Sequence, residues 1–431
     1  MSANNDVMSN GLERLRNKEK YWKDSYKWLE AIFYFFQGLA MSGIMIYANI
    51  SMTQRWNVPI TEITRTTALM GIPMYLKMLS GLLSDRVPIG RWGRRRPYIL
   101  IGGLLYIPAY ALLIFIDDFT PAWVAALSLS MAAWVFVDGT LDALTVDITP
   151  DEKSNEMQGA AVAGRFLGMA GGTFVASFLG PQIGWRPVLM FVAFSGVLQA
   201  ITALLFKEPP ITAADLKDEL PLKEVFKETF GRRSSWFGIL LATFAFGTLG
   251  FGTALLAYLT TPIGNGGLGL TPQEAGIVGI VNYIALSVGS FIFGKIAAKP
   301  KPEDKIKFYW ISSGVSWLLM IPWIFINSET ATLSLVFIGM ILYGLMSSVV
   351  YVLTYGLAMQ LCPESIEGFF FSTLTSFMNV GQVALGPNLV SASAELIGVG
   401  INITSFVCII LNVIYLLFAT SIIRQSQENV S

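Results

Sequence analysis

Twelve apolar stretches, each about as long as a bilayer-crossing helix, dominate this chain of 431 residues. A helix needs about 20 mostly apolar residues to cross the hydrocarbon core of a membrane. Hydrophobic residues make up 54% of the sequence and charged residues only 13%, an excess that a single water-soluble core could not bury. The sequence therefore predicts an all-α integral membrane protein with twelve transmembrane helices. The predicted spans are 29–50, 64–84, 97–116, 121–145, 157–180, 187–206, 236–261, 272–297, 308–327, 331–359, 368–394 and 396–423.

The distribution of positive charge predicts how these helices are oriented. Of the 29 Lys and Arg residues, 24 fall before the first span, in the loops after even-numbered spans, or after the last span. Loops rich in Lys and Arg stay in the cytoplasm. Both termini are therefore expected in the cytoplasm of a multi-pass protein of the cell (inner) membrane. The polar N-terminal segment does not resemble a cleavable signal peptide.

The longest connection between spans divides the chain into two sets of six. The ten residues from Asp142 align with the ten residues from Tyr355, and each copy ends in Pro followed by an acid. Two such repeats are typical of rocker-type secondary transporters, whose binding site lies near the middle of the membrane between the repeats. The predicted parts are an N-terminal cytoplasmic segment (1–28), a first bundle (29–206), a cytoplasmic linker (207–235), a second bundle (236–423) and a tail (424–431).

Composition argues against several other classes of protein. The sequence contains no histidine, and its only cysteines are Cys362 and Cys408, too few for a disulfide framework or a metal cluster. The net charge is zero, which gives no global field for nucleic acid. No phosphate-binding fingerprint is present in the required strand–loop–helix context. We therefore expect no enzyme activity, no cofactor, no metal, no nucleic-acid partner and no ATP drive within this chain.

Four charged residues fall inside predicted spans: Lys77, Asp138, Asp142 and Arg165. Lys77, Asp138 and Arg165 lie roughly 10–12 Å from the cytoplasmic boundary at 1.5 Å per helical residue. Because a charge in lipid is costly, the four should face one another or a wet cavity. One interpretation is a static salt-bridge cluster between helices. The other is a lining of the transport path, in which an Asp carries a proton because no histidine is available.

Neutral polar residues in the second half are candidates to face this cluster. Polar side chains also bond between packed membrane helices, so a purely structural role stays open for them. A glycine series at Gly164, Gly168, Gly171 and Gly172 is typical of close helix packing. The candidate neutral residues are Asn282, Tyr351, Tyr355, Asn379 and Gln382.

Three sequence blocks resemble a known family. The block "YLKMLSGLLSDRVPIGRWGRRRPYIL" (75–100) is similar to the loop 2–3 signature of the major facilitator superfamily. The blocks "DGTLDALTVD" (138–147) and "LCPESIEGFFFSTLTSFMNVGQ" (361–382) look most like the folate–biopterin transporter branch. Glycoside–pentoside–hexuronide and sucrose symporters, and a bacteriochlorophyll-associated branch, have similar loops.

The resemblance implies a secondary active transporter that moves a small polar organic solute by alternating access. The expected partners are that solute, a proton or another cation, and the lipid bilayer, with the chain acting as a monomer. If the solute is a folate or pterin, Asp138 or Asp142 suits the pterin N–H groups, and Lys77 or Arg165 suits the glutamate tail. A sugar or glycoside symporter and a membrane assembly factor for pigment complexes are the alternatives.

The charged loop after the second span is predicted to form a cytoplasmic gate. The resemblance implies this role for Gly81, Asp85 and Arg86. Arginine–carboxylate pairs are directional and often bidentate, so pairs between loops of the two halves can form when the cytoplasmic side closes. Simple topological anchoring is the alternative, because exposed pairs contribute only about 0–1 kcal/mol each. The other predicted gate residues are Arg94, Arg95, Asp147 and Glu367.

Overall fold

The computed structural model describes residues 20, 22–87, 89, 95–149, 154–208, 221–297, 304–361, 367–401 and 403–428. Within these ranges every regular element is a helix. The first half contains α2 (Tyr26–Ile50), η1 (Ser51–Arg55), α3 (Ile60–Met70), α4 (Ile72–Tyr75), α5 (Lys77–Arg86), α6 (Arg96–Ile114), α7 (Pro121–Ile148), α8 (Ser154–Phe174), η3 (Val175–Leu179), α9 (Gly180–Ile183) and α10 (Trp185–Leu204). The second half contains α12 (Leu222–Phe230), α13 (Arg233–Gly247), α14 (Gly250–Thr260), η4 (Ile263–Asn265), α15 (Pro272–Ala297), α16 (Lys305–Leu318), α17 (Ile321–Ile324), α18 (Leu333–Gln360), α19 (Glu367–Asn379), η6 (Val380–Leu385), α20 (Gly386–Ile397), η7 (Ile403–Ser405) and α21 (Phe406–Glu428).

The predicted spans correspond to helices, and some of them are segmented. Nine helical stretches of the described residues are long and apolar enough to cross a membrane. The other three predicted spans are built from shorter pieces: α3, α4 and α5; α16 and α17; and α19, η6 and α20. The protein is thus an all-α, multi-pass membrane protein, as the sequence predicts.

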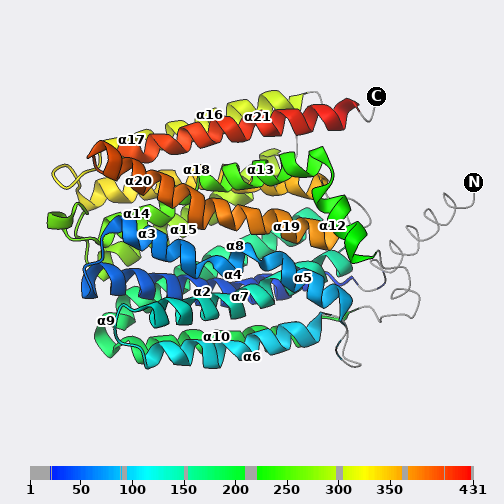
Figure 1. The fold of residues 1–431 in the computed structure, drawn as a ribbon, viewed down its shortest axis with the longest axis horizontal. Helices are drawn as coiled ribbons and strands as arrows, with labels where there is room; N and C mark the ends of the chain where they lie inside the picture. The colour runs from blue at the N-terminus through cyan, green and yellow to red at the C-terminus, as the bar shows by residue number, and fades with distance from the viewer. Residues whose placement is uncertain are drawn as a thin grey trace, which may run out of the picture.

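Two hydrophobic cores organise the molecule. One is formed mainly by helices α2 to α10 and the other mainly by helices α12 to α21. The blue-to-cyan and the orange-to-red elements accordingly occupy opposite sides of the view in Figure 1. Where the two sets meet, α5 packs along α19 and α8 packs along α15. These four helices therefore carry contacts between the halves.

The second predicted span breaks at the depth of its buried charge. Pro73 stands at the start of α4, and its ring removes a backbone N–H donor. In an unbroken helix the Met78 N–H would donate to Met74 O. Here Met78 N–H donates to Ser376 Oγ of α19 (3.0 Å), and Asn379 Nδ2 donates to Met74 O (3.1 Å). Side chains of α19, in the second half, thus form hydrogen bonds with the backbone groups that the break leaves unpaired in the first half.

Wide helical turns recur at matching places in the two halves. The π-helical turns η3 and η6 both end at a Leu that is followed by Gly-Pro at the start of the next helix, at residues 179–181 and 385–387. Single π-helical turns inside α-helices are rare and are frequent at functional sites. The repeated turn is a second internal correspondence between the halves.

The twelfth span begins later than the sequence predicts. The prediction of one span over 396–423 is wrong at its start, because α20 continues to Ile397 and α21 starts at Phe406. Gly398 has a left-handed backbone (φ 73°), and its N–H donates to Ala394 O (2.9 Å). This C-terminal cap, which favours glycine, ends α20. The sequence is apolar on both sides of this cap, so the hydrophobic pattern alone did not indicate where α20 ends.

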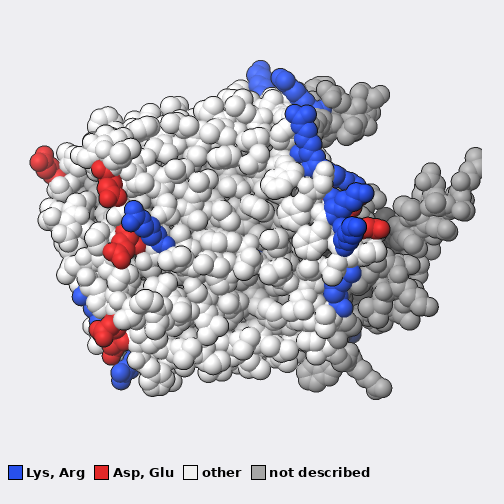
Figure 2. All heavy atoms as spheres, viewed as in Figure 1, with Lys and Arg blue, Asp and Glu red and all other residues white. Residues whose placement is uncertain are grey.

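Charged side chains gather at the two ends of the molecule (Figure 2). Lys and Arg dominate the end at which α12 lies and α21 finishes, and the middle of the described part of this face carries no charge. Lys223 on α12 and Arg232, two residues after α12 ends, are exposed. The apolar middle matches the lipid-facing zone of a membrane protein.

Candidate functional site

A cluster of ion pairs lies where the second span is broken. Lys77 is the first residue of α5, directly after the break, and its ammonium group pairs with carboxylates of both Asp138 and Asp142 on α7. The Lys77–Asp142 distance is 2.6 Å. Arg165 on α8 pairs with Asp138 at 2.7 Å. The four charges that the sequence placed at one depth are therefore in one network, with two cations and two anions.

Burial differs among these four side chains. The Lys77 and Asp138 side chains are 4% and 2% exposed, whereas those of Asp142 and Arg165 are 15% and 22% exposed. Charged groups removed from water are stable only when they are paired and hydrogen-bonded. Asp138 is the centre of the network, because it accepts from Lys77, Arg165 and Gln37.

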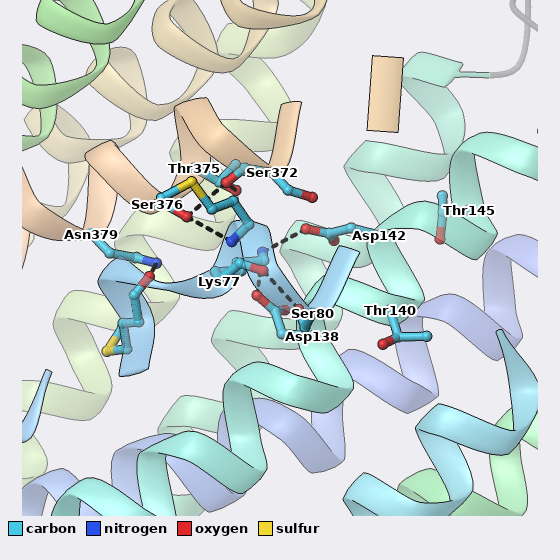
Figure 3. A network of polar contacts seen from close by, with 12 residues as sticks. Lys77, Ser80, Asp138, Thr140, Asp142, Thr145, Ser372, Thr375, Ser376 and Asn379 are labelled. Carbon is cyan, nitrogen blue, oxygen red and sulfur yellow. Dashed lines mark hydrogen bonds and ion pairs between the residues drawn. The ribbon is translucent and has the colours of Figure 1, made fainter. Parts of the chain in front are cut away.

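Close helix packing allows Lys77 to reach α7. Gly139 follows Asp138, and a Cβ added to Gly139 would lie 2.1 Å from Ser80 Oγ on α5. Only a residue without a side chain lets α5 and α7 approach to this distance. Figure 3 shows Lys77 between the two Asp side chains, with Ser80 beside Asp138.

Helix α2 contributes three polar side chains to the cluster: Gln37, which its place inside the first predicted span makes a candidate from sequence, and Glu30 and Tyr34, which the sequence analysis did not single out. Glu30, Tyr34 and Gln37 lie on one face of α2, at spacings of four and three residues. Tyr34 donates to Asp142, and Gln37 Nε2 donates to Asp138 Oδ1 (2.7 Å). The guanidinium of Arg165 also lies 4.4 Å from the centre of the Tyr34 ring.

Glu30 continues this polar face toward the start of α2. Thr145 Oγ1 on α7 donates to Glu30 Oε1 (2.7 Å). Residues 30, 34 and 37 of α2 bond to residues 145, 142 and 138 of α7, respectively. This reversed order is expected for two helices that run in opposite directions. The matching spacings on the two spans are the signal that could have revealed Glu30, which stands at the second position of the predicted span.

The second half faces this cluster with aromatic and amide side chains. Tyr355 interacts electrostatically with Arg165 and Lys77. It stacks on Tyr351 with ring centroids 6.2 Å apart, and Phe246 meets both rings edge-on. Phe166 on α8 in turn meets Tyr351, so aromatic contacts join the halves beside Arg165. Such rings offer flat apolar faces next to buried charge.

The remaining neutral candidates hold helices together. Gln382 Nε2 donates to the Tyr351 hydroxyl (3.1 Å), which fixes the ring. Asn379 binds the backbone of α4, as described above. Asn282 is 7% exposed, and a Cβ added to Gly344 on α18 would lie 2.6 Å from its carbonyl oxygen. Asn282 thus lies at the α15–α18 contact, and within the described ranges no hydrogen bond joins it to the ion pairs.

Sequence and structure comparisons place this chain among known proteins. The sequence profile of the Major Facilitator Superfamily matches residues 31–387. The chain belongs to the Major Facilitator Superfamily. Relatives include the anhydromuropeptide permease of Escherichia coli (strain K12), 28% identical over 332 residues, which are 74% of this chain and 65% of the permease. The probable folate-biopterin transporter 5 of Arabidopsis thaliana is 25% identical over 340 residues, which are 75% of this chain and 65% of that protein.

Solved structures of this superfamily share the fold. The fucose:proton symporter of Escherichia coli superimposes with a TM-score of 0.64 at 12% identity, covering 93% of this chain and 98% of the symporter. A nucleoside transporter gives a TM-score of 0.63 at 13% identity, covering 92% and 98%. The predicted superfamily and its likeness to the folate–biopterin branch are confirmed. The family and these relatives are transporters, in agreement with the prediction that the chain is not an enzyme.

The alignments with the curated relatives cover part of the length of each relative. This facilitator chain aligns with about two thirds of the length of each curated relative, 65% in both cases. Among the described residues, no group of three His, Cys, Asp or Glu side chains is suited to hold a metal ion. The polar network is therefore described by its organic side chains alone.

Most of the predicted gate lies outside the described residues. Arg94 and the side chains of Asp85, Asp147 and Glu367 are not described, so the predicted pairs between loops remain a prediction. Gly81 faces α19, where an added Cβ would lie 3.0 Å from Ser372 Oγ. Arg86 ends α5 and is half-buried.

Arg95 is buried and forms hydrogen bonds within the first half. Its side chain is among the largest that are fully buried, and Nη1 donates to Ser84 Oγ on α5 (2.7 Å). Its backbone N–H donates to Glu208 Oε1, just after α10 (2.7 Å). These contacts tie the ends of α5, α6 and α10 together.

Proposed function

We propose that this chain is a secondary active transporter that moves a small polar organic solute by alternating access, coupled to a proton. The observation that carries the proposal is the buried, charge-balanced network of Lys77, Asp138, Asp142 and Arg165 at the meeting of the two halves. Family membership supports the same activity. A charged network at this depth has a cost in free energy that a purely structural helix contact avoids.

The side chains around the network favour a solute that combines a ring with a carboxylate. Nε of the Arg165 guanidinium has no hydrogen-bond partner among the described residues, and the side chain is 22% exposed. A guanidinium binds carboxylates in a planar, often bidentate geometry. Tyr351, Tyr355 and Phe246 supply flat faces beside it for the ring. Among the solutes in the names of the relatives, a folate and a muropeptide combine a ring with a carboxylate.

The alternating motion is proposed to separate contacts between the two halves at opposite ends in turn. Thr64 of α3 and Ser391 of α20 are joined by a hydrogen bond of 2.9 Å near one end. Thr260 Oγ1 also donates to Asn49 Oδ1 at that end (2.8 Å). At the other end α5 packs on α19. Transport requires each group of contacts to open while the other is closed.

A thermal-unfolding screen of the purified protein tests the solute class. Folic acid, biopterin, an anhydromuropeptide and simple glycosides are the probes, because a ligand that binds only the folded form raises its apparent stability by about 2.7 kcal/mol at 100 times its Kd. We expect folic acid or the anhydromuropeptide to stabilise the wild-type protein, and Arg165→Gln to remove that effect. Stabilisation by glycosides alone would favour the sugar symporter, and co-purification with pigment complexes would favour an assembly factor.

A reversible cross-link tests alternating access. Thr64→Cys combined with Ser391→Cys, in a chain that also carries Cys362→Ser, should form a disulfide on oxidation because the two native side chains are in contact. We expect uptake of the stabilising probe to stop on oxidation and to return on reduction, with each single cysteine variant as the control. Continued uptake by the cross-linked protein would contradict the proposed motion.

A further inference from the structure

The polar network contains a fifth ionisable group that its charge balance does not require. Glu30 is 1% exposed and lies in the fifth position of α2. Lys77 and Arg165 already balance Asp138 and Asp142 within the pairs described above. An ionised Glu30 would add an uncompensated negative charge at a position that is itself almost fully buried. Burial of an unpaired charge is far more costly than burial of a neutral carboxylic acid.

The contacts of Glu30 are those of a carboxylic acid rather than a carboxylate. Oε1 accepts from Thr145 Oγ1 at 2.7 Å. Among the described residues, Oε2 has no hydrogen-bond partner, and no ion pair reaches either oxygen. A buried carboxylate accepts several hydrogen bonds or pairs with a cation. A neutral acid carries no net charge, so its burial with a single accepted hydrogen bond from Thr145 is less costly.

Among the described residues, several charged or polar groups lie near Glu30 on α2 and on the helices packed against it. Helix α7 brings Asp142 and Asp138, and α8 brings Arg165. On α2 itself the neighbours at helical spacing are Tyr34, four residues after Glu30, and the half-buried cation Lys27, three residues before it. Helix α10 carries one charged residue, Arg186, at its opposite end. Among the described residues no cation forms an ion pair with Glu30, and the nearby Arg165 is already paired with Asp138.

We propose that Glu30 is the residue that carries the transported proton. This inference rests on the proposed function, because it assigns the coupling ion of the same site. It also replaces the expectation from sequence that Asp138 or Asp142 carries the proton: Asp138 accepts from two cations and Asp142 from one. In the state described here the proton is bound to a Glu30 carboxylate oxygen.

Release of the proton follows from the position of Glu30. It lies one helical turn from the start of α2, about 6 Å along the axis, whereas Gln37 and Asp138 lie deeper. When the ends of the bundle at this side separate, water reaches Glu30 first. The O–H bond then breaks, the proton passes to water, and the carboxylate remains. Arg165, which acts on both Glu30 and Asp138, partly balances the new charge.

Infrared titration of the purified, full-length protein tests this assignment without any solute. A protonated carboxyl group has a C=O stretching band that disappears on ionisation. We expect the wild-type protein to show a buried carboxylic-acid band that is lost as the pH is raised. Glu30→Gln should remove this band, whereas Asp138→Asn and Asp142→Asn should retain it. Glu62→Gln, which changes an exposed acid on α3, is the matched control and should also retain it.

Two further variants keep the test decisive if Glu30→Gln fails to fold. Thr145→Val removes the donor to Oε1 and should shift the acid band to higher frequency, because the C=O bond then loses its hydrogen bond. Glu30→Asp should keep an acid band at a changed pH midpoint. A band that is unaltered by Glu30→Gln or by Thr145→Val, or that disappears in Asp138→Asn or Asp142→Asn, would overturn the proposal.

A transport measurement separates this inference from the proposed function. Proteoliposomes loaded with a pH-sensitive dye are given labelled folic acid and labelled anhydromuropeptide, with and without a pH gradient. Gradient-driven accumulation should fall at least tenfold in Glu30→Gln and stay near wild type in Glu62→Gln. Absence of uptake by the wild-type protein would count against the proposed function, while the infrared result would still decide whether Glu30 binds the proton. Equal gradient dependence in the wild type and Glu30→Gln would overturn the role of Glu30.

Discussion

At the scale of single residues, the two aspartates of α7 have different environments. Asp138 is 2% exposed and bonds to Lys77, Arg165 and Gln37, whereas Asp142 is 15% exposed and bonds to Lys77 and Tyr34. The loss of folding stability on removing one partner of a buried ion pair depends on which interactions the other partner keeps. The two positions therefore allow a matched comparison.

Asp138→Asn should lower the stability of the folded protein more than Asp142→Asn. The change leaves Arg165 without its carboxylate and should cost about 3–5 kcal/mol, the range for breaking a buried pair. Asp142→Asn leaves Lys77 paired with Asp138 and should cost less. Thermal unfolding in detergent measures the difference. Adding Lys77→Met to Asp138→Asn restores the charge balance and should recover part of the loss. Equal effects of the two single changes would contradict this account.

At the scale of elements, glycines on α8 set the distance to α2. Cβ atoms added to Gly164, Gly168 and Gly172 would lie 2.1, 1.9 and 2.2 Å from the carbonyl oxygens of Ala31, Phe35 and Leu39. This spacing of four residues confirms the predicted close packing at three of the four glycines. Gly171 is different, because the nearest atom to its added Cβ is Phe35 Cζ at 3.8 Å.

Gly168→Ala should therefore destabilise the protein far more than Gly171→Ala. In the first variant the new methyl group overlaps backbone that cannot move without separating α2 from α8, and overpacking of this kind costs typically about 1–3 kcal/mol. In the second variant the methyl group makes an ordinary contact, with an effect within about 0.5 kcal/mol. The yield of monodisperse protein and its unfolding temperature report the difference, and two similar variants would show that α8 does not pack as described.

The break in the second span should depend on α19. Ser376→Ala leaves the Met78 N–H without its acceptor, and an unsatisfied buried donor costs about 1–3 kcal/mol. Ser393→Ala is the control, because the Ser393 hydroxyl bonds to Leu389 O within its own helix. We expect the unfolding temperature to fall in Ser376→Ala and to remain near wild type in Ser393→Ala. A stable Ser376→Ala variant would mean that water or another group satisfies the break.

At the scale of the whole molecule, charge distribution predicts the orientation in the membrane. Lys223 lies at the end rich in Lys and Arg, and Ser328 lies in the loop between α17 and α18, after the ninth span. In chains that carry Cys362→Ser, a membrane-impermeant maleimide should label Ser328→Cys in intact cells and Lys223→Cys only after permeabilisation. The remaining native thiol, Cys408, is fully buried and should give little background. Labelling of Lys223→Cys in intact cells would reverse the predicted topology.

The sequence alone predicted the class of protein because partition into lipid depends on local composition. Runs of about 20 apolar residues specify spans wherever they stand, and loop charge specifies their orientation. The same reasoning found Lys77, Asp138, Asp142 and Arg165, because a charge inside an apolar run is visible without knowing its neighbours. The superfamily followed from motifs in three short blocks.

Only the tertiary structure decided which side chains meet. Glu30 stands at the edge of its apolar run, and its part in the network depends on α2 and α7 running in opposite directions at a fixed register. Arg95 is fully buried, and its hydrogen bonds to Ser84 and Glu208 depend on α5, α6 and α10 converging there. The break before Lys77 is satisfied by residues about 300 positions away, at 3.0 and 3.1 Å. Contacts between distant helices are set by packing geometry, which composition and spacing along one chain do not contain.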